Sequence, residues 1–98
     1  MVEFLVNIKF IGPNGWKQED VDALIAKERA HAAVLVEQGH LVRMWRVPGR
    51  RENWGLWRAN DATHLHDILT GLPFWPYMDL QVHPVARHPV DPLRDEMF

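Results

Sequence analysis

The chain has 98 residues, no cysteine and a formal net charge of −2 at neutral pH, and 47% of its residues are hydrophobic. This length predicts a single domain with a sizeable core. The charge leaves no basic footprint for nucleic acid, and the lack of cysteine excludes disulfides and thiolate chemistry. Because no stretch approaches the ~18 apolar residues of a membrane span and the N-terminus has no signal-peptide pattern, we expect a cytoplasmic protein without a membrane partner.

The first expected elements are a strand at residues 4–10 and a long helix from Gln18 to Gln38. Every second residue of the strand is apolar, which predicts a strand with one apolar face. The breakers at residues 12–15 end this strand. The helix carries an apolar stripe at helical spacing, and Gly39 follows it at the position of a C-terminal cap. The residues of the stripe are Val21, Leu24, Ile25, Ala32 and Leu35.

A β-hairpin is expected next, with strands at residues 41–47 and 53–58 joined by a turn that contains proline and glycine. A regular alternation along the first of these strands places Leu41 and Arg43 on the face opposite to Arg46.

A second, shorter helix begins after the N-cap pair Asn60-Asp61. Its apolar stripe consists of Leu65, Ile68, Leu69 and Leu72. The prolines that follow force a rigid, non-helical connector, and a last strand is expected at residues 77–82. Because the nitrogen of Pro84 has no hydrogen to donate, we expect the end of this strand to lie at a sheet edge or a bulge.

The order strand, helix, strand, strand, helix, strand predicts an α+β fold of the ferredoxin-like βαββαβ type. Such a sandwich has a four-stranded antiparallel sheet with two helices on one face. We assign residues 1–90 to this single domain and residues 91–98 to a C-terminal tail, either disordered or docked on a neighbouring subunit. Five tryptophans are many for so small a core, so we expect the second face of the sheet to pack against another copy in a homo-oligomer.

One charged residue, Glu28, interrupts the apolar stripe of the long helix. It lies near the centre of the stripe, one turn from Leu24 and one turn from Ala32, so its carboxylate should point toward the core. Burial disfavours the charged form and raises the pKa of a carboxyl group, which is the profile of a proton-transfer residue in an apolar pocket. The alternative is a structural Glu28 that pairs with an arginine of the sheet.

Other kinds of chemistry find less support in the sequence. The six histidines include no pair at the i, i+4 spacing of a helical metal site, and the chain has neither serine nor cysteine as a nucleophile. We therefore expect no metal and no cofactor, and acid–base chemistry with Glu28 as the first candidate and His31, one turn away, as the second. Arg46 and Arg43 are candidates for a bidentate contact with a substrate carboxylate, with solvated or interface charges as the alternative.

Several blocks of the sequence occur in a characteristic order and spacing. They are Trp45-Arg46-Val47-Pro48-Gly49, Asn53, Leu65-His66-Asp67, the run from Leu72 to Asp79, and Arg87-His88-Pro89. Together they resemble the muconolactone delta-isomerase family without gaps from about Ala26 to Pro89. Members of that family also carry a glutamate at the position of Glu28.

The resemblance implies a ferredoxin-like subunit of a homo-oligomer, a dimer or higher and a decamer in characterised members. It also implies a cytoplasmic isomerase that needs no cofactor and converts a small lactone acid, muconolactone, to 3-oxoadipate enol-lactone by a proton shift. Glu28 is then the acid and base. The residues expected around the substrate are Arg46 for its carboxylate or enolate, Asn53 and Tyr77 as hydrogen-bond donors, Trp45 as a wall, and His31.

The chain departs from that family at several polar positions. Leu5 and Arg43 stand where members usually carry histidine, Arg51-Glu52 stands in place of Tyr-Ala, and Trp57-Arg58-Ala59 stands in place of Phe-Asp-Val. If these positions line the pocket, we expect a substituted or chlorinated lactone, or a larger ring, in place of muconolactone.

Two other classes of function stay open on the sequence alone. Small dimeric ferredoxin-like proteins include cofactor-independent monooxygenases and cyclases that act on aromatic or polyketide substrates with Trp, His and Asn in a similar pocket. A non-catalytic ligand-binding or assembly module would need Glu28 only as a buried ion-pair partner. Oxygen consumption with a quinol favours the monooxygenase, whereas uptake of solvent deuterium during turnover favours the isomerase.

Overall fold

The computed structural model describes residues 1–93 and contains one four-stranded sheet and two α-helices. Along the chain the elements are β1 (Val2–Phe10), α1 (Gln18–Glu37), β2 (Leu41–Arg46), β3 (Glu52–Ala59), α2 (Ala62–Thr70), the short 3-10 helix η1 (Trp75–Tyr77) and β4 (Met78–Val85). The strand order across the sheet is β2-β3-β1-β4, and every neighbouring pair is antiparallel. The predicted α+β ferredoxin-like sandwich is therefore confirmed.

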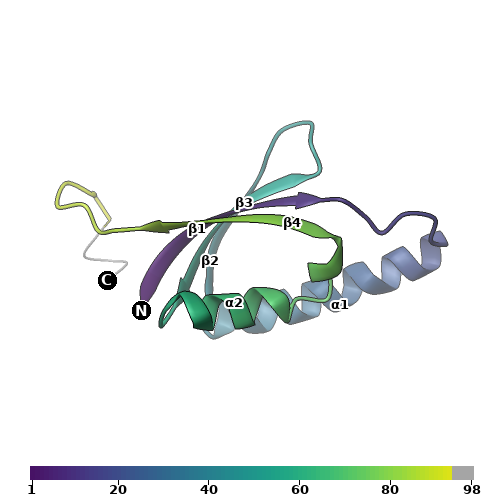
Figure 1. Ribbon diagram of the computed structural model, residues 1–98, viewed down its shortest axis with the longest axis horizontal. Coiled ribbons are helices and arrows are strands. Elements are labelled where there is room, and N and C mark those ends of the chain that lie inside the picture. The colour runs from purple at the N-terminus through teal and green to yellow at the C-terminus, as the bar shows by residue number, and fades with distance from the viewer. Residues whose placement is uncertain (94–98) are drawn as a thin grey trace.

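Both helices lie on the same side of the sheet, so the sandwich has two layers (Figure 1). The side chains of Phe4, Val6 and Ile8 on the helix side of β1 are at most 4% exposed. They share one apolar cluster with Leu65 and Leu69 of α2. This cluster forms the core, because burying each large apolar side chain stabilises a fold by roughly 1.5–3 kcal/mol.

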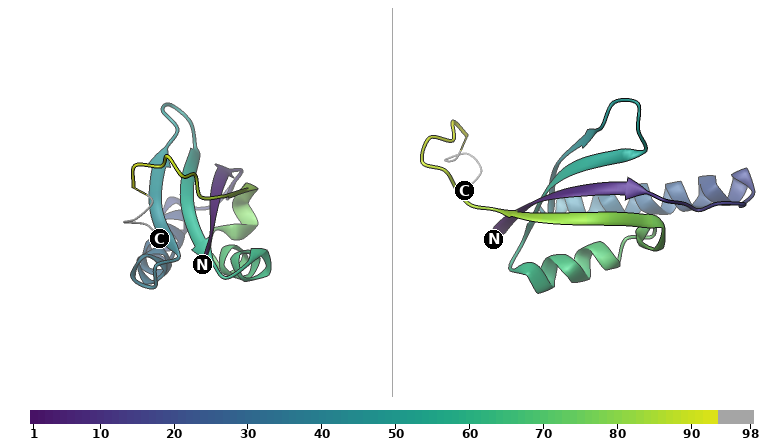
Figure 2. Two further views of the ribbon diagram at one scale, coloured as in Figure 1. Left: turned by 90° about the vertical axis from the view of Figure 1, so that its left-hand side faces the viewer. Right: turned by 45° about the horizontal axis from the view of Figure 1, so that its top comes forward.

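The first half of α1 extends past the end of the sheet, together with the loop that precedes it (Figure 1, Figure 2). Leu35, near the other end, is the buried residue of this helix. Val21 and Ile25 in the overhanging half are only partly buried. The apolar stripe therefore packs tightly on the sheet at its C-terminal end, and its N-terminal part is available as the wall of a pocket.

β2 contains an irregularity between Leu41 and Arg43. Leu41 pairs with Trp57, whereas Arg43 pairs with Leu56, so β2 has one extra residue relative to β3. The shift places Leu41 on the helix side of the sheet together with Arg46. The regular alternation predicted from the sequence, with Leu41 and Arg46 on opposite faces, is thus wrong because it leaves no room for a bulge.

β4 is an edge strand of the sheet, beside β1. It runs to Val85 and includes Pro84, which lies opposite Phe4. The strand is longer than predicted because an edge strand leaves the amides on its outer side without a ladder partner, so a proline is tolerated there. The expectation that this part of the chain lies at a sheet edge is confirmed.

The chain beyond β4 is described as far as Leu93. Most of the predicted tail, residues 94–98, lies outside the described residues, so its disorder or docking stays a prediction. Within the described range, none of the helices is long and apolar enough to cross a membrane.

Candidate active site

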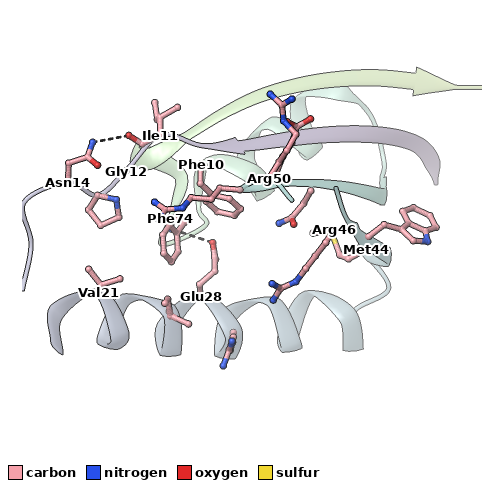
Figure 3. A pocket seen from close by; sticks show the side chains of 17 residues that line it. Phe10, Ile11, Gly12, Asn14, Val21, Glu28, Met44, Arg46, Arg50 and Phe74 are labelled. Atoms are coloured by element: carbon pink, nitrogen blue, oxygen red, sulfur yellow. Dashed lines mark hydrogen bonds and ion pairs between the residues drawn. The ribbon is translucent and has the colours of Figure 1, made fainter. Parts of the chain in front are cut away.

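A pocket of about 770 Å³ lies between the overhanging half of α1, the loop that follows β1, and the hairpin of β2 and β3 (Figure 3). Its apolar wall includes Phe10, Val21, Ile25, Met44 and Phe74. Glutamate and arginine side chains supply charge on the same surface. A pocket of this size, apolar with a few convergent polar groups, suits a small organic acid.

Glu28 stands in the middle of α1 and reaches toward Phe74 (Figure 3). Its Oε1 accepts a hydrogen bond from the backbone N–H of Phe74 at 3.3 Å. Its Oε2 is buried and has no hydrogen-bond donor among residues 1–93. Burial raises the pKa of the Glu28 carboxyl, against the opposing effects of the Phe74 N–H and of His31. The group therefore combines an oxygen that accepts no hydrogen bond from residues 1–93 with a higher proton affinity than an exposed carboxylate, as a general base requires.

The segment before β4 holds the carboxyl of Glu28. Phe74 precedes η1 and is 9% exposed, and its ring meets that of Phe10 edge-on at 5.5 Å between centroids. Pro73 and Pro76 restrict the backbone on either side of it. The prediction of a non-helical connector is wrong in part, because residues 75–77 form the 3-10 helix η1. The bond from this segment to Glu28 was not predicted. Pro73 and Pro76 were the sequence signal for this bond, because they fix the direction of the backbone N–H of Phe74.

Several arginines border the pocket and give it a cationic character. Arg50 is paired, since its Nε lies 3.2 Å from Oε1 of Glu52. Arg29, Arg46 and Arg51 also border the pocket, and none forms an ion pair within the described part of the chain. Arg46 leaves β2 on the helix side, and its side chain extends toward α1 (Figure 3). A guanidinium in this position can bind a carboxylate through two parallel hydrogen bonds.

The hairpin side of the pocket is held by a short hydrogen-bond network. The buried side chain of Asn7 donates from Nδ2 to Oε2 of Glu52 at 3.0 Å and to the carbonyl oxygen of Asn53 at 3.3 Å. These bonds fix the backbone of Asn53, which pairs with Arg46 across the hairpin and borders the pocket. The amide of Asn53 and the guanidinium of Arg46 are thus placed side by side at one wall.

The other predicted residues lie at the border of the pocket or outside it. Trp45 borders the pocket, as do Glu28, Arg46 and Asn53. Tyr77 and His31 are not part of the lining. The Tyr77 ring packs edge-on against Trp16, whereas His31 acts on Glu28 through its charge. Direct contact of these side chains with a substrate stays a prediction.

The donor and acceptor groups of the pocket are carboxylate, guanidinium and amide. Elsewhere too, residues 1–93 contain no group of three or more histidine, aspartate or glutamate side chains that could hold a metal ion. The set of groups around Glu28 suits proton transfer on an anionic substrate, because it offers a base, a cation and a neutral hydrogen-bonding group on one surface.

Comparison with known proteins places the chain in a family. The sequence model of the muconolactone delta-isomerase family matches residues 2–91. Muconolactone Delta-isomerase 1 of Acinetobacter lwoffii is 34% identical over 84 residues, which cover 86% of this chain and 86% of that protein. The muconolactone Delta-isomerase of Cupriavidus pinatubonensis is 33% identical over 86 residues, or 88% of this chain and 94% of that protein.

A solved structure shows the same relationship in three dimensions. The crystal structure of a muconolactone isomerase at 3.3 Å resolution matches with a TM-score of 0.83 and 30% sequence identity, over 92% of this chain and 94% of that chain. The agreement therefore covers nearly all of both chains. The chain belongs to the muconolactone delta-isomerase family.

Proposed function

We propose that the protein is a cofactor-free isomerase that converts muconolactone, or a substituted analogue, to the corresponding enol-lactone by moving one proton. The observation that carries this proposal is the carboxyl of Glu28. It lies at the wall of a cationic pocket, its pKa is raised by burial, and one of its oxygens has no donor among residues 1–93. Membership of the family supports an isomerase of this type.

A single carboxylate is sufficient for the proton shift. In muconolactone, the ring C–H at the γ-carbon is acidic because the C=C bond conjugates it with the lactone carbonyl. Oε2 of Glu28 takes this proton, the electron pair of the C–H bond forms a new C=C bond, and negative charge moves to the carbonyl oxygen as a dienolate. A proton returned by Glu28 to the α-carbon completes the shift, so that atoms and charge balance without a co-reactant. A raised pKa favours both transfers near neutral pH.

The arginines of the pocket support the choice of an anionic substrate. Arg46 extends toward the helix that carries Glu28, and we assign it to the carboxylate of the substrate. Without such a cation, a substrate carboxylate would be repelled by the ionised Glu28 and would raise its pKa further. Arg29 and Arg51 add positive potential at the pocket and favour the capture of an acid.

The positions at which this chain departs from its family bear unequally on the substrate. Leu5 and Arg43 lie on the side of the sheet away from the helices, opposite Leu56 of β3 in the pairing. Arg51 borders the pocket. We therefore propose that the recognition of the lactone acid is retained and that the change at the hairpin, where Arg51 lies, decides which ring substituents are accepted.

We also propose that the protein is a cytoplasmic homo-oligomer in which the outer face of the sheet is covered by another copy. Both helices lie on the opposite face (Figure 1). Leu5, Trp54 and Leu56 lie on the outer face, and Trp45 on β2 is 44% exposed. Association would remove this apolar surface from water. Light scattering after size exclusion at micromolar concentration tests the proposal, and a monomer would contradict it.

The reaction is tested by incubating the protein with muconolactone in D₂O. We expect the ultraviolet absorbance of the conjugated lactone to fall and deuterium to enter the product at the α-carbon. The same assay with ring-chlorinated muconolactones identifies the preferred substituent. A protein that turns over none of these lactones would contradict the proposed function. Oxygen consumption with a quinol would favour a monooxygenase instead.

A further inference from the structure

The indole N–H of Trp57 is a buried donor that the reaction described above does not use. Trp57 is 2% exposed, and its Nε1 has no hydrogen-bond acceptor among residues 1–93. A buried donor without a partner destabilises a fold, and native proteins leave few such groups. No acceptor among residues 1–93 offsets this cost with a hydrogen bond, so the N–H is a candidate for a functional role.

The indole lies over Gly55, on the helix side of β3. A side chain on Gly55 would place its Cβ 2.6 Å from Nε1 of Trp57 and 2.6 Å from Sδ of Met44. The indole nitrogen of Trp57 and the sulfur of Met44 are therefore separated by at most twice 2.6 Å. Glycine is required at this position because any side chain would displace the indole nitrogen, the thioether or both. The space above Gly55 is thus occupied by a hydrogen-bond donor from one neighbour and a sulfur atom from the other.

Met44 connects this donor with the pocket. Its side chain lines the pocket together with Glu28, and the residue is 41% exposed. The side chain of Met44 therefore separates the N–H of Trp57 from the pocket. Methionine is unbranched and has three rotatable side-chain bonds, so it adapts its shape to a ligand at little cost. A change of its rotamer would open the path from the pocket to the N–H.

We propose that Trp57, which stands where members of the family usually carry phenylalanine, is a catalytic residue particular to this chain. Its indole N–H donates a hydrogen bond to the carbonyl oxygen of the bound lactone once Met44 has moved aside. The proposal rests on the proposed isomerase function. When Glu28 removes the proton, the electron pair moves through the ring and leaves negative charge on this oxygen. The N–H of Trp57 stabilises that charge and keeps its own proton throughout, so it changes no bond. A donor fixed in a water-poor site is well suited to this role, because it needs no reorganisation as charge develops.

The substitution Trp57→Phe tests the proposal, since it removes the N–H and restores the aromatic ring that members of the family usually carry at this position. We expect kcat for the isomerisation to fall about 10- to 100-fold, with little change in KM, because the hydrogen bond strengthens as charge develops. Trp54→Phe is the matched control, since Trp54 lies on the same strand but faces away from the helices. It should leave kcat unchanged. Equal kcat values for Trp57→Phe and the wild-type protein would overturn the proposal.

A binding experiment tests the same contact without turnover. The saturated analogue of muconolactone, (5-oxotetrahydrofuran-2-yl)acetate, keeps the carbonyl and the carboxylate but has no double bond to shift. We expect it to move the indole N–H resonance of Trp57 downfield in ¹H–¹⁵N spectra of the wild-type protein, with the signal assigned through its proximity to Gly55. If the analogue shifts the signals of Arg46 and Phe74 but not this one, the proposal is wrong.

The outcomes separate this inference from the proposed function. A wild-type protein that does not isomerise the lactones contradicts the function itself. A protein that isomerises them as well with phenylalanine at position 57 contradicts only the role of Trp57. Because the binding experiment uses the unmodified chain, it remains decisive even if Trp57→Phe fails to fold.

Discussion

Glu3 and Glu28 each have one buried carboxylate oxygen, and they differ in what surrounds them. Glu3 lies on β1, is 6% exposed, and has Nε of Arg58 at 3.9 Å from its Oε2. Glu28 lies on α1 at the wall of the pocket, with the backbone N–H of Phe74 on one oxygen. Burial is the largest effect on both groups, and it raises the pKa of each.

A raised pKa alone therefore does not identify a catalytic group. Glu3 has a guanidinium beside it and lies outside the pocket. Glu28 forms no ion pair with residues 1–93, and it lines the pocket. Access to the pocket and the lack of an ion pair therefore distinguish Glu28 from Glu3.

The largest effect is expected from replacing each carboxylate by its amide. Glu28→Gln should lower kcat for the lactone roughly 100- to 10,000-fold, the usual contribution of a general acid–base group. Glu3→Gln should leave kcat close to that of the wild-type protein, because Glu3 touches no substrate. The measurement is the absorbance assay with both variants at saturating substrate, accompanied by thermal unfolding to verify that both fold.

Two results would change this picture. If Glu28→Gln retained most of its turnover, the base would lie elsewhere, and His31 would be the next residue to replace. If Glu3→Gln were as inactive as Glu28→Gln while still folded, the distinction between the two carboxylates would be wrong.

A smaller effect is expected from the cation that we assign to the substrate. Arg46→Gln should raise KM about 10- to 100-fold, which corresponds to the roughly 1.5–3 kcal/mol of a hydrogen bond to a charged group. Arg43→Gln is the control on the same strand, because the Arg43 guanidinium lies over the ring of Trp45 at 5.0 Å and pairs on the outer face. Steady-state kinetics of both variants give the comparison. An equal rise of KM in Arg46→Gln and Arg43→Gln would show that substrate binding depends on the overall charge and not on a contact with Arg46.

The sequence alone was sufficient to predict the sandwich fold and the inward direction of the Glu28 side chain. Apolar periods of two and of 3.6 residues are local properties, and they predicted the four strands and the two α-helices. The inward direction of Glu28 followed from the same period, because a residue at the centre of an apolar stripe must face the sheet. These features could be predicted since each depends on neighbours along the chain.

Contacts between distant segments could not be predicted in the same way. The hydrogen bond from Phe74 to Glu28 joins residues 46 positions apart. The position of the Trp57 indole depends on a glycine in its own strand and on Met44 across the hairpin. The bulge in β2 has no sequence signal, because Val42 fits a regular strand as well as an irregular one. Such features arise from packing between segments that are distant in the sequence, and most of the pocket is built from contacts of this kind.

A still smaller effect is expected from replacing His31, whose charge acts on Glu28. The charge of His31 lowers the pKa of the Glu28 carboxyl, and the base must be ionised to accept a proton. The value of kcat/KM should therefore rise with pH as Glu28 ionises, and in His31→Ala this rise should move to higher pH. His40→Ala is the control, since the ring of His40 packs against His64 away from the pocket. A rise at the same pH in His31→Ala and the wild-type protein would contradict the assigned effect.

The smallest effect concerns stability, where the two carboxylates should behave alike. When the pKa of a carboxyl group is higher in the folded state than in the unfolded state, protonation of that group stabilises the folded protein. The corresponding stability is present below the ordinary carboxyl value of 4.5 and is lost as pH rises through the raised value. Glutamine does not titrate, so the free energy of unfolding of Glu28→Gln relative to the wild-type protein should increase from pH 4 to pH 8.

The same direction is expected for Glu3→Gln, with a smaller gain where Arg58 still attracts the carboxylate of the wild-type protein. Urea unfolding of both variants across this pH range is the measurement. A decrease of relative stability with pH in Glu28→Gln would mean that the ionised carboxylate stabilises the fold, as a structural ion pair would. Parallel stability profiles combined with unequal activity would place the difference between Glu3 and Glu28 in their access to substrate, because burial acts on both in the same direction.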